Sequence, residues 1–124
     1  MLSRNSICLL LLLSSILLVG CKPQVAPTDP NVAQQSLETM LKAWKDGGKS
    51  ADLKSGQPEI IAVDDDWESG VKLKSYRSVG TPFDDGKNLH CTIELILVTK
   101  AGREYKREIV YIVGTSPVIT IFRR

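Results

Sequence analysis

The chain has 124 residues, with 16 Lys and Arg against 14 Asp and Glu and a formal net charge of +2 at pH 7. This length fits one small domain and excludes two. The even balance of charge excludes a nucleic-acid surface that depends on bulk positive charge. A hydrophobic fraction of 43% excludes a chain that is disordered throughout.

The first twenty residues form a segment of their own. A short start that contains Arg4 is followed by an apolar run, Ile7 to Val19, which only two serines interrupt. A membrane-spanning helix needs about 20 apolar residues. The run is therefore too short for a span and fits the core of a signal peptide.

The run ends in Leu18-Val19-Gly20-Cys21, which resembles the lipobox of bacterial lipoproteins. The resemblance implies that residues 1–20 are removed by cleavage between Gly20 and Cys21, and that Cys21 then carries lipid. Two acyl signals of this kind suffice for stable membrane anchoring.

In many proteobacterial lipoproteins an aspartate after the cysteine means retention in the inner membrane, and this chain has Lys22 there. The resemblance therefore favours the periplasmic face of the outer membrane, if the cell has two membranes. An ordinary secretory signal with a cysteine near its end is the alternative.

Residues 21–29 are expected to be a tether, because Lys22 to Asn31 contains three prolines and no apolar periodicity. Cys8 leaves with the signal segment and Cys21 carries the lipid, so Cys91 is the one remaining thiol. A single thiol cannot form an internal disulfide, and the domain is expected to contain none.

An amphipathic helix is predicted for residues 30–46. Asp29 is a good N-cap, Pro30 is tolerated in the first helical turn, and Gly47-Gly48 ends the pattern. The apolar stripe consists of Ala33, Leu37, Met40, Leu41 and Trp44. On the polar side, Glu38 and Lys42 have the order and spacing of an i,i+4 ion pair.

The hydrophobic pattern changes after residue 58 to the period of two that is typical of strands. One helical turn, 51–54, is predicted before this point. Strands are predicted over 60–63, 71–76, 89–97, 104–113 and 118–122, with a hairpin turn at 99–103. The acidic run at 64–66 is expected to end the first of these strands.

These elements predict an α+β domain over residues 30–124, in which one N-terminal helix packs on a curved, four- to five-stranded antiparallel sheet. The expected core includes Trp44, Leu37, Leu95 and Ile109. The order of elements resembles that of cystatin-like and NTF2-like domains, and Val32–Asp52 is similar to the opening helix of exported NTF2-like domains. The resemblance implies a sheet that curls round the helix. A cystatin-type inhibitor would also show a Gln-x-Val-x-Gly hairpin and a Pro-Trp wedge, and neither occurs here.

No catalytic constellation is predicted. His90 and Cys91 are neighbours on a strand, so they point to opposite faces, and Cys91 is expected to be buried and unreactive. A carboxylate-only site would use Asp64, Asp66 and Glu94, which no spacing brings together. The run Asp64-Asp65-Asp66 with Glu68 lacks the spacing and the glycine of a calcium loop. We therefore expect neither metal nor cofactor, and a protein that is not an enzyme.

Trp67, Tyr76 and Phe83 are the candidates for a binding surface, although packing in the core is the alternative for Trp67. Trp44 lies on the helix stripe and is expected in the core. A charged strand edge is expected from basic residues near two strands, namely Arg103, Lys106, Arg107, Arg123 and Arg124.

The sequence thus predicts a protein of the bacterial cell envelope that is anchored through lipid on Cys21 and carries a non-catalytic binding or structural domain. Its expected partner is another envelope protein, with no nucleic acid. The alternative is a small-ligand binder or NTF2-like enzyme that uses the concave face of the sheet. A filled apolar concave face would favour the first interpretation, and a cavity with convergent polar groups would favour the second.

Overall fold

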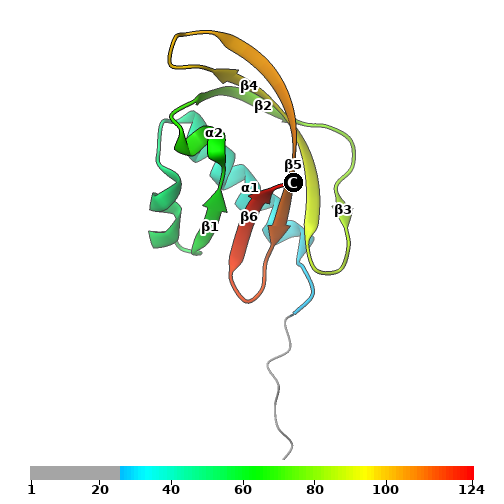
Figure 1. Cartoon of the computed structure of the whole chain (residues 1–124). Coiled ribbons are helices and arrows are strands. Elements are labelled where there is room, and N and C mark those ends of the chain that lie inside the picture. Colours follow the sequence, from blue (N-terminus) through cyan, green and yellow to red (C-terminus); the bar gives the residue numbers. More distant parts are fainter. Residues whose placement is uncertain (1–25) are drawn as a thin grey trace, which may run out of the picture.

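The computed structural model describes residues 26–124 (Figure 1). The elements in chain order are α1 (Pro30–Lys45), the 3₁₀ helix η1 (Ser50–Ser55), β1 (Ile60–Val63), α2 (Asp65–Glu68), β2 (Lys72–Ser78), β3 (Phe83–Asp84), β4 (Leu89–Val98), β5 (Glu104–Gly114) and β6 (Ile119–Arg123). The predicted signal peptide, its cleavage site and Cys21 lie outside the described residues. No helix within residues 26–124 is long and apolar enough to cross a membrane.

Helix α1 begins at its expected residue because Asp29 caps it. The Asp29 carboxylate accepts hydrogen bonds from the backbone N–H groups of Asn31 at 3.0 Å and Val32 at 3.2 Å. The helix ends at Lys45, one residue before the predicted end, and Gly47 then adopts a φ of 85° that favours glycine. Every residue of the predicted apolar stripe is buried.

The sheet formed by residues 26–124 has six strands and is mixed, which corrects the prediction of four to five antiparallel strands. The strand order is β1-β6-β5-β4-β2, and β3 pairs with β4. Strands β1 and β6 are parallel, with Ile60 opposite Ile119, and the other neighbours are antiparallel. Parallel strands need a long connection, and here four other strands lie between them in the chain. The period of two predicts a strand but not its neighbour, so the sequence pattern did not reveal this pairing.

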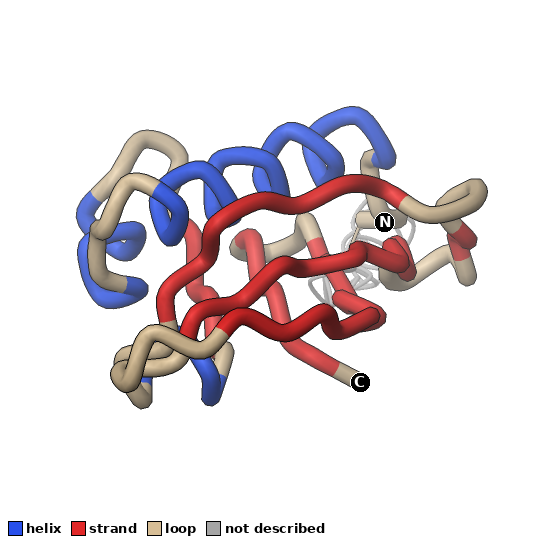
Figure 2. Tube along the Cα trace, turned by 90° about the horizontal axis from the view of Figure 1, so that it is seen from above, coloured by secondary structure: helices blue, strands red, loops and turns tan. Residues whose placement is uncertain are grey.

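Helix α1 covers one face of the curled sheet and lies alongside β2 (Figure 2). We call the covered side the inner face and the opposite side the outer face. On β4 the buried residues alternate from Leu89 to Leu97 and belong to the same core as the helix stripe. Leu37, Trp44, Leu95 and Ile109 all lie in this one core, as predicted.

The acidic run ends β1, as predicted, and continues into a one-turn helix, α2. Asp64 caps this helix by accepting hydrogen bonds from the backbone N–H groups of Asp66 at 3.0 Å and Trp67 at 3.2 Å. The cap holds the Asp64 side chain against the sheet, where it is fully buried.

The predicted tether is attached to the domain from Ala26 onward. The Ala26 N–H donates to the Ser116 hydroxyl at 3.2 Å, and the Asp29 N–H donates to the Thr115 hydroxyl at 3.0 Å. Thr28, between these two contacts, is buried. The chain therefore enters the domain beside the turn that joins β5 to β6.

Candidate binding groove

A groove of about 660 Å³ opens between α1 and the last part of β2. Its floor is apolar and includes Leu37, Leu41 and Ile93. Its walls are polar, with Gln35 and Glu38 on the helix side and Tyr76 and Ser78 on the strand side. Ligand pockets commonly have volumes of about 300–1,000 Å³ and combine an apolar lining with a few polar groups, which is the arrangement found here.

Tyr76 and Glu38 face each other across this groove. The Tyr76 hydroxyl donates to Glu38 Oε1 at 2.6 Å, and this hydrogen bond is the main reason why the pKa of Tyr76 is raised to about 12. The predicted ion pair between Glu38 and Lys42 is not formed, and no cation of residues 26–124 lies within 4.0 Å of the Glu38 carboxylate. The groove therefore contains a carboxylate that forms no ion pair within residues 26–124.

Strand β2 forms one edge of the sheet and pairs only with β4 among the described elements. The Val79 N–H donates to the Thr92 carbonyl of β4 at 2.9 Å. In an antiparallel pair the backbone groups of alternate residues point to opposite sides of the strand. The N–H and C=O groups of Ser78 and Tyr76 consequently point away from β4, to the side of β2 where no described strand pairs.

The three aromatic residues predicted to form a binding surface do not lie together. Trp67 is buried, stacks on Trp44 with ring centroids 5.8 Å apart, and donates its indole N–H to the Gly48 carbonyl at 2.9 Å. Tyr76 lines the groove, whereas Phe83 is 64% exposed and pairs with His90 of β4. Trp67 is therefore a core residue, and only Tyr76 contributes to the groove.

His90 and Cys91 point to opposite faces of β4, as predicted. Cys91 is buried, and burial raises the pKa of its thiol, which disfavours the reactive thiolate. His90 Nε2 lies 2.8 Å from the Asp85 carboxylate, and this contact is the main cause that lowers the pKa of Asp85 to about 2. The two residues cannot act as a nucleophile and base.

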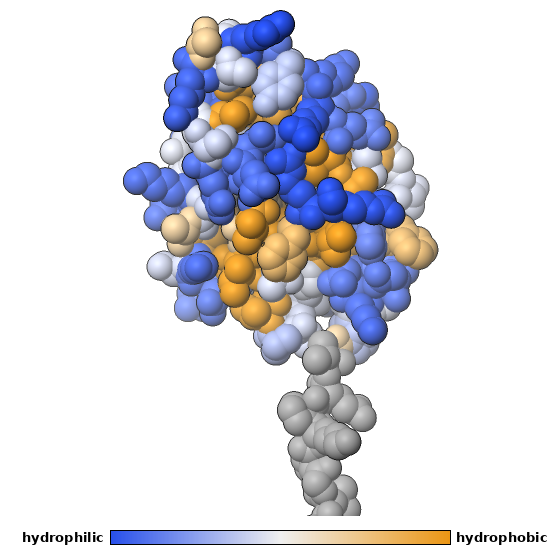
Figure 3. Space-filling model, viewed as in Figure 1, coloured by the Kyte–Doolittle hydropathy of each residue, from blue (hydrophilic) through white to orange (hydrophobic). Residues whose placement is uncertain are grey.

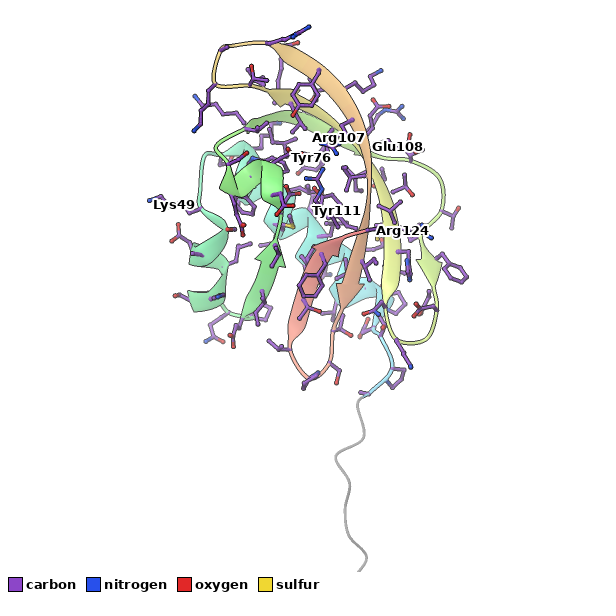
Figure 4. The ribbon with its side chains drawn as sticks, viewed as in Figure 1. Lys49, Tyr76, Arg107, Glu108, Tyr111 and Arg124 are labelled. Atoms are coloured by element: carbon purple, nitrogen blue, oxygen red, sulfur yellow. The ribbon has the colours of Figure 1, made fainter. Side chains whose placement is uncertain are left out.

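A polar network centred on the fully buried Asp64 joins α2 to β5 and β6 at the inner face. Asp64 Oδ2 accepts from the Tyr111 hydroxyl at 2.6 Å, and Asp64 Oδ1 accepts from the Arg123 guanidinium at 3.2 Å. Arg123 also donates to Asp66 at 2.9 Å, and Arg107 donates to the same carboxylate at 3.3 Å. Figure 4 shows Arg107 and Tyr111 on the side of β5 that faces α2.

Two basic residues of the predicted charged strand edge, Arg107 and Arg123, belong to this network and pair with acidic residues of α2 and its cap. Burial is the largest single influence on the pKa of Arg123, and it lowers that pKa. The Asp64 charge and the hydrogen bond to Asp66 together outweigh burial, so the pKa is raised. Burial and the Asp64 charge raise the pKa of Tyr111. The negative charges of two carboxylates balance the positive charges of two guanidinium groups. The network therefore has a structural role and connects α2 to the sheet.

The network brings together Asp64 and Asp66 but not Glu94. Glu94 lies on the outer face, where Arg77 donates to it at 2.8 Å and lowers its pKa. Within residues 26–124, His, Cys, Asp and Glu side chains nowhere form a group of three that could hold a metal ion.

Apolar side chains also gather on the outer face (Figure 3). Val63 of β1 is 40% exposed and Phe122 of β6 is 42% exposed, and the half-buried Ile61, Val110 and Ile112 lie on the same face. This patch is the second surface of the domain that could contact a partner.

Comparisons with protein-family models, with curated proteins and with solved structures give no match. The function is therefore inferred from the residues and their geometry.

Proposed function

We propose that the protein is a lipid-anchored, non-catalytic binding domain of the bacterial cell envelope, and that the groove between α1 and β2 is its binding site. The observation that carries the proposal is the groove itself, with its apolar floor, its polar walls and the Glu38 carboxylate that forms no ion pair within residues 26–124. A helix in a curled sheet also supports the resemblance to cystatin-like and NTF2-like domains.

A binding role is favoured over catalysis by the groups that line the groove. Glu38 is the one carboxylate that residues 26–124 contribute to the groove. The Tyr76 hydroxyl next to it has a pKa of about 12, so Tyr76 is neutral at physiological pH. Acid–base catalysis works best with groups whose pKa is near the working pH, and nucleophilic catalysis needs an activated nucleophile. The Cys91 thiol that lines the floor has a pKa raised by burial.

The point where the chain enters the domain supports membrane anchoring at short range. Cys21 lies five residues before Ala26, and a fully extended chain of that length spans at most about 18 Å. Ala26 is held at the β5–β6 turn by Ser116. Lipid on Cys21 would therefore keep this end of the domain close to the bilayer.

In-cell photo-crosslinking tests the binding site. A benzoylphenylalanine residue replaces Gln35, an exposed residue of the groove wall, and in a matched control it replaces Lys45, which is exposed on the same helix but outside the groove. Cells that make each variant are irradiated. The variant with the photoreactive residue at position 35 is expected to give covalent adducts that are heavier than the protein alone, and the variant at position 45 is expected to give none.

A third variant carries the photoreactive residue in place of Phe122 on the outer face. Adducts from position 122 together with none from position 35 would move the binding site to the outer face and contradict the proposal. Adducts at equal yield from positions 35 and 45 would also contradict it, because they would show nonspecific proximity.

A further inference from the structure

The open edge of β2 indicates which class of ligand the groove takes. We propose that the groove binds an extended peptide segment of a partner protein, which adds to the sheet beside β2 and places a basic side chain at Glu38. This inference rests on the proposed function, since it names the occupant of the same groove.

The backbone of β2 is the first observation that favours a peptide. Tyr76 and Ser78 direct N–H and C=O groups away from β4, and no strand of residues 26–124 pairs with this side. Two residues of one strand, spaced by two, match the hydrogen-bonding period of an added extended chain. A compact small molecule has no such repeat.

The first half of β2 is protected against strand addition, and this limits where the peptide binds. Lys72 and Lys74 are exposed there, and the pairing with β4 is irregular between Leu73 and Ser75. Charged side chains and bulges are common protections of edge strands. The part from Tyr76 to Ser78 lacks this bulge and lies in the groove.

Charge complementarity selects a basic peptide. Glu38 accepts one hydrogen bond on Oε1, from the neutral Tyr76 hydroxyl, and no cation of the described residues forms an ion pair with it. Arg77, the nearest cation in sequence to Tyr76, is engaged by Glu94 on the outer face at 2.8 Å. A Lys or Arg side chain of the peptide would pair with Glu38, and an apolar neighbour could contact Leu37 and Ile93 on the floor.

Selection of a displayed library of random dodecapeptides on the mature chain tests the inference. Selected peptides are then synthesised, and their Kd values are measured by fluorescence polarisation against four proteins: the unchanged chain, S78P, S78A and E38Q. We expect the selected peptides to be rich in Lys or Arg.

The S78P variant removes one N–H donor from the open edge, where proline is tolerated, so it is expected to fold and to weaken binding about tenfold or more. The S78A variant keeps the backbone donor and removes only the hydroxyl from the groove wall, so it should weaken binding less than S78P does. The E38Q variant should weaken binding about two- to fivefold, as expected for loss of an exposed ion pair.

Should S78P fail to fold, peptides methylated on alternate backbone nitrogens give the same information. One of the two methylation registers blocks the donors that face β2, and that register alone should abolish binding to the unchanged chain.

Three results would overturn the inference. Selected peptides that bind S78P and the unchanged chain equally would exclude strand addition. Adducts at position 35 in cells, with no peptide enriched above background, would leave the groove as the binding site and exclude a peptide occupant. The absence of both adducts and enriched peptides would exclude the groove itself.

Discussion

Replacing Tyr111 with Phe is expected to destabilise the domain by about 1.5–3 kcal/mol, the usual contribution of a hydrogen bond to a charged group. Asp64 is 0% exposed. Its Oδ1 atom accepts from two backbone N–H groups and from Arg123, but the Tyr111 hydroxyl at 2.6 Å is the one donor of residues 26–124 to Oδ2. The substitution keeps the ring and its packing, so it leaves a buried carboxylate oxygen without a partner.

Urea unfolding of the chain expressed from Lys22 measures this loss. With a denaturant dependence of about 1–3 kcal/mol per molar urea, the loss should lower the unfolding midpoint by roughly 1 M without changing the slope. The matched control is Tyr76→Phe, which removes a hydroxyl that also lies 2.6 Å from a carboxylate oxygen. Glu38 is exposed, so water replaces the lost donor and the free energy of unfolding should fall by less than about 1 kcal/mol.

The comparison of the two variants tests the reasoning. Equal and small losses for both tyrosines would refute the idea that the Asp64 network is buried and has a structural role. A larger loss for Tyr76→Phe would place the stabilising contact in the groove instead.

Three further predictions concern the anchor, the core and the groove. The Cys21→Ser variant should leave the membrane fraction, as cell fractionation and immunoblotting would show; a variant that stays membrane-bound at normal size contradicts lipidation. Truncating the fully buried Leu95 to Ala should lower the free energy of unfolding by about 2–5 kcal/mol in urea titrations, and a loss well below 1 kcal/mol would place β4 at the surface. The Tyr76 pKa of about 12 lies above its unfolded value, so its stabilising hydrogen bond is present below about pH 10 and is lost as the pH rises through 12. Ultraviolet titration of E38Q should show this ionisation nearer pH 10, and an unchanged midpoint would contradict the assigned cause.

Much of the fold could be predicted because local patterns determine it. Asp29, Pro30 and the spacing from Ala33 to Trp44 place α1 within one residue. The alternation on β4 correctly assigns Cys91 to the buried face and His90 to the other. Strand neighbours depend on contacts far apart in sequence, so the parallel pair of β1 and β6 has no local signal.

The groove and the buried network were less predictable for the same reason. Glu38 has a suitable partner four residues away in Lys42, yet it bonds to Tyr76, which is 38 residues away. Arg123 and Asp64 are separated by 59 residues, and the sequence pattern around each of them indicates an exposed charged segment. One signal in the sequence was available. An N-cap carboxylate such as that of Asp64 is held against the start of its helix, so the first aspartate of an acidic run that follows a buried strand can itself be buried.

Amide hydrogen exchange at the open edge of β2 tests the central claim most directly, because it needs no ligand. In the free chain, Tyr76 and Ser78 should exchange nearly as fast as unstructured amides, while Val79, which donates to Thr92, and Arg77 should be protected. Such an alternation would establish that the edge beside the groove is open for strand addition. Equal protection of all four amides would show that the edge is already paired or covered, and would contradict the groove as the binding site.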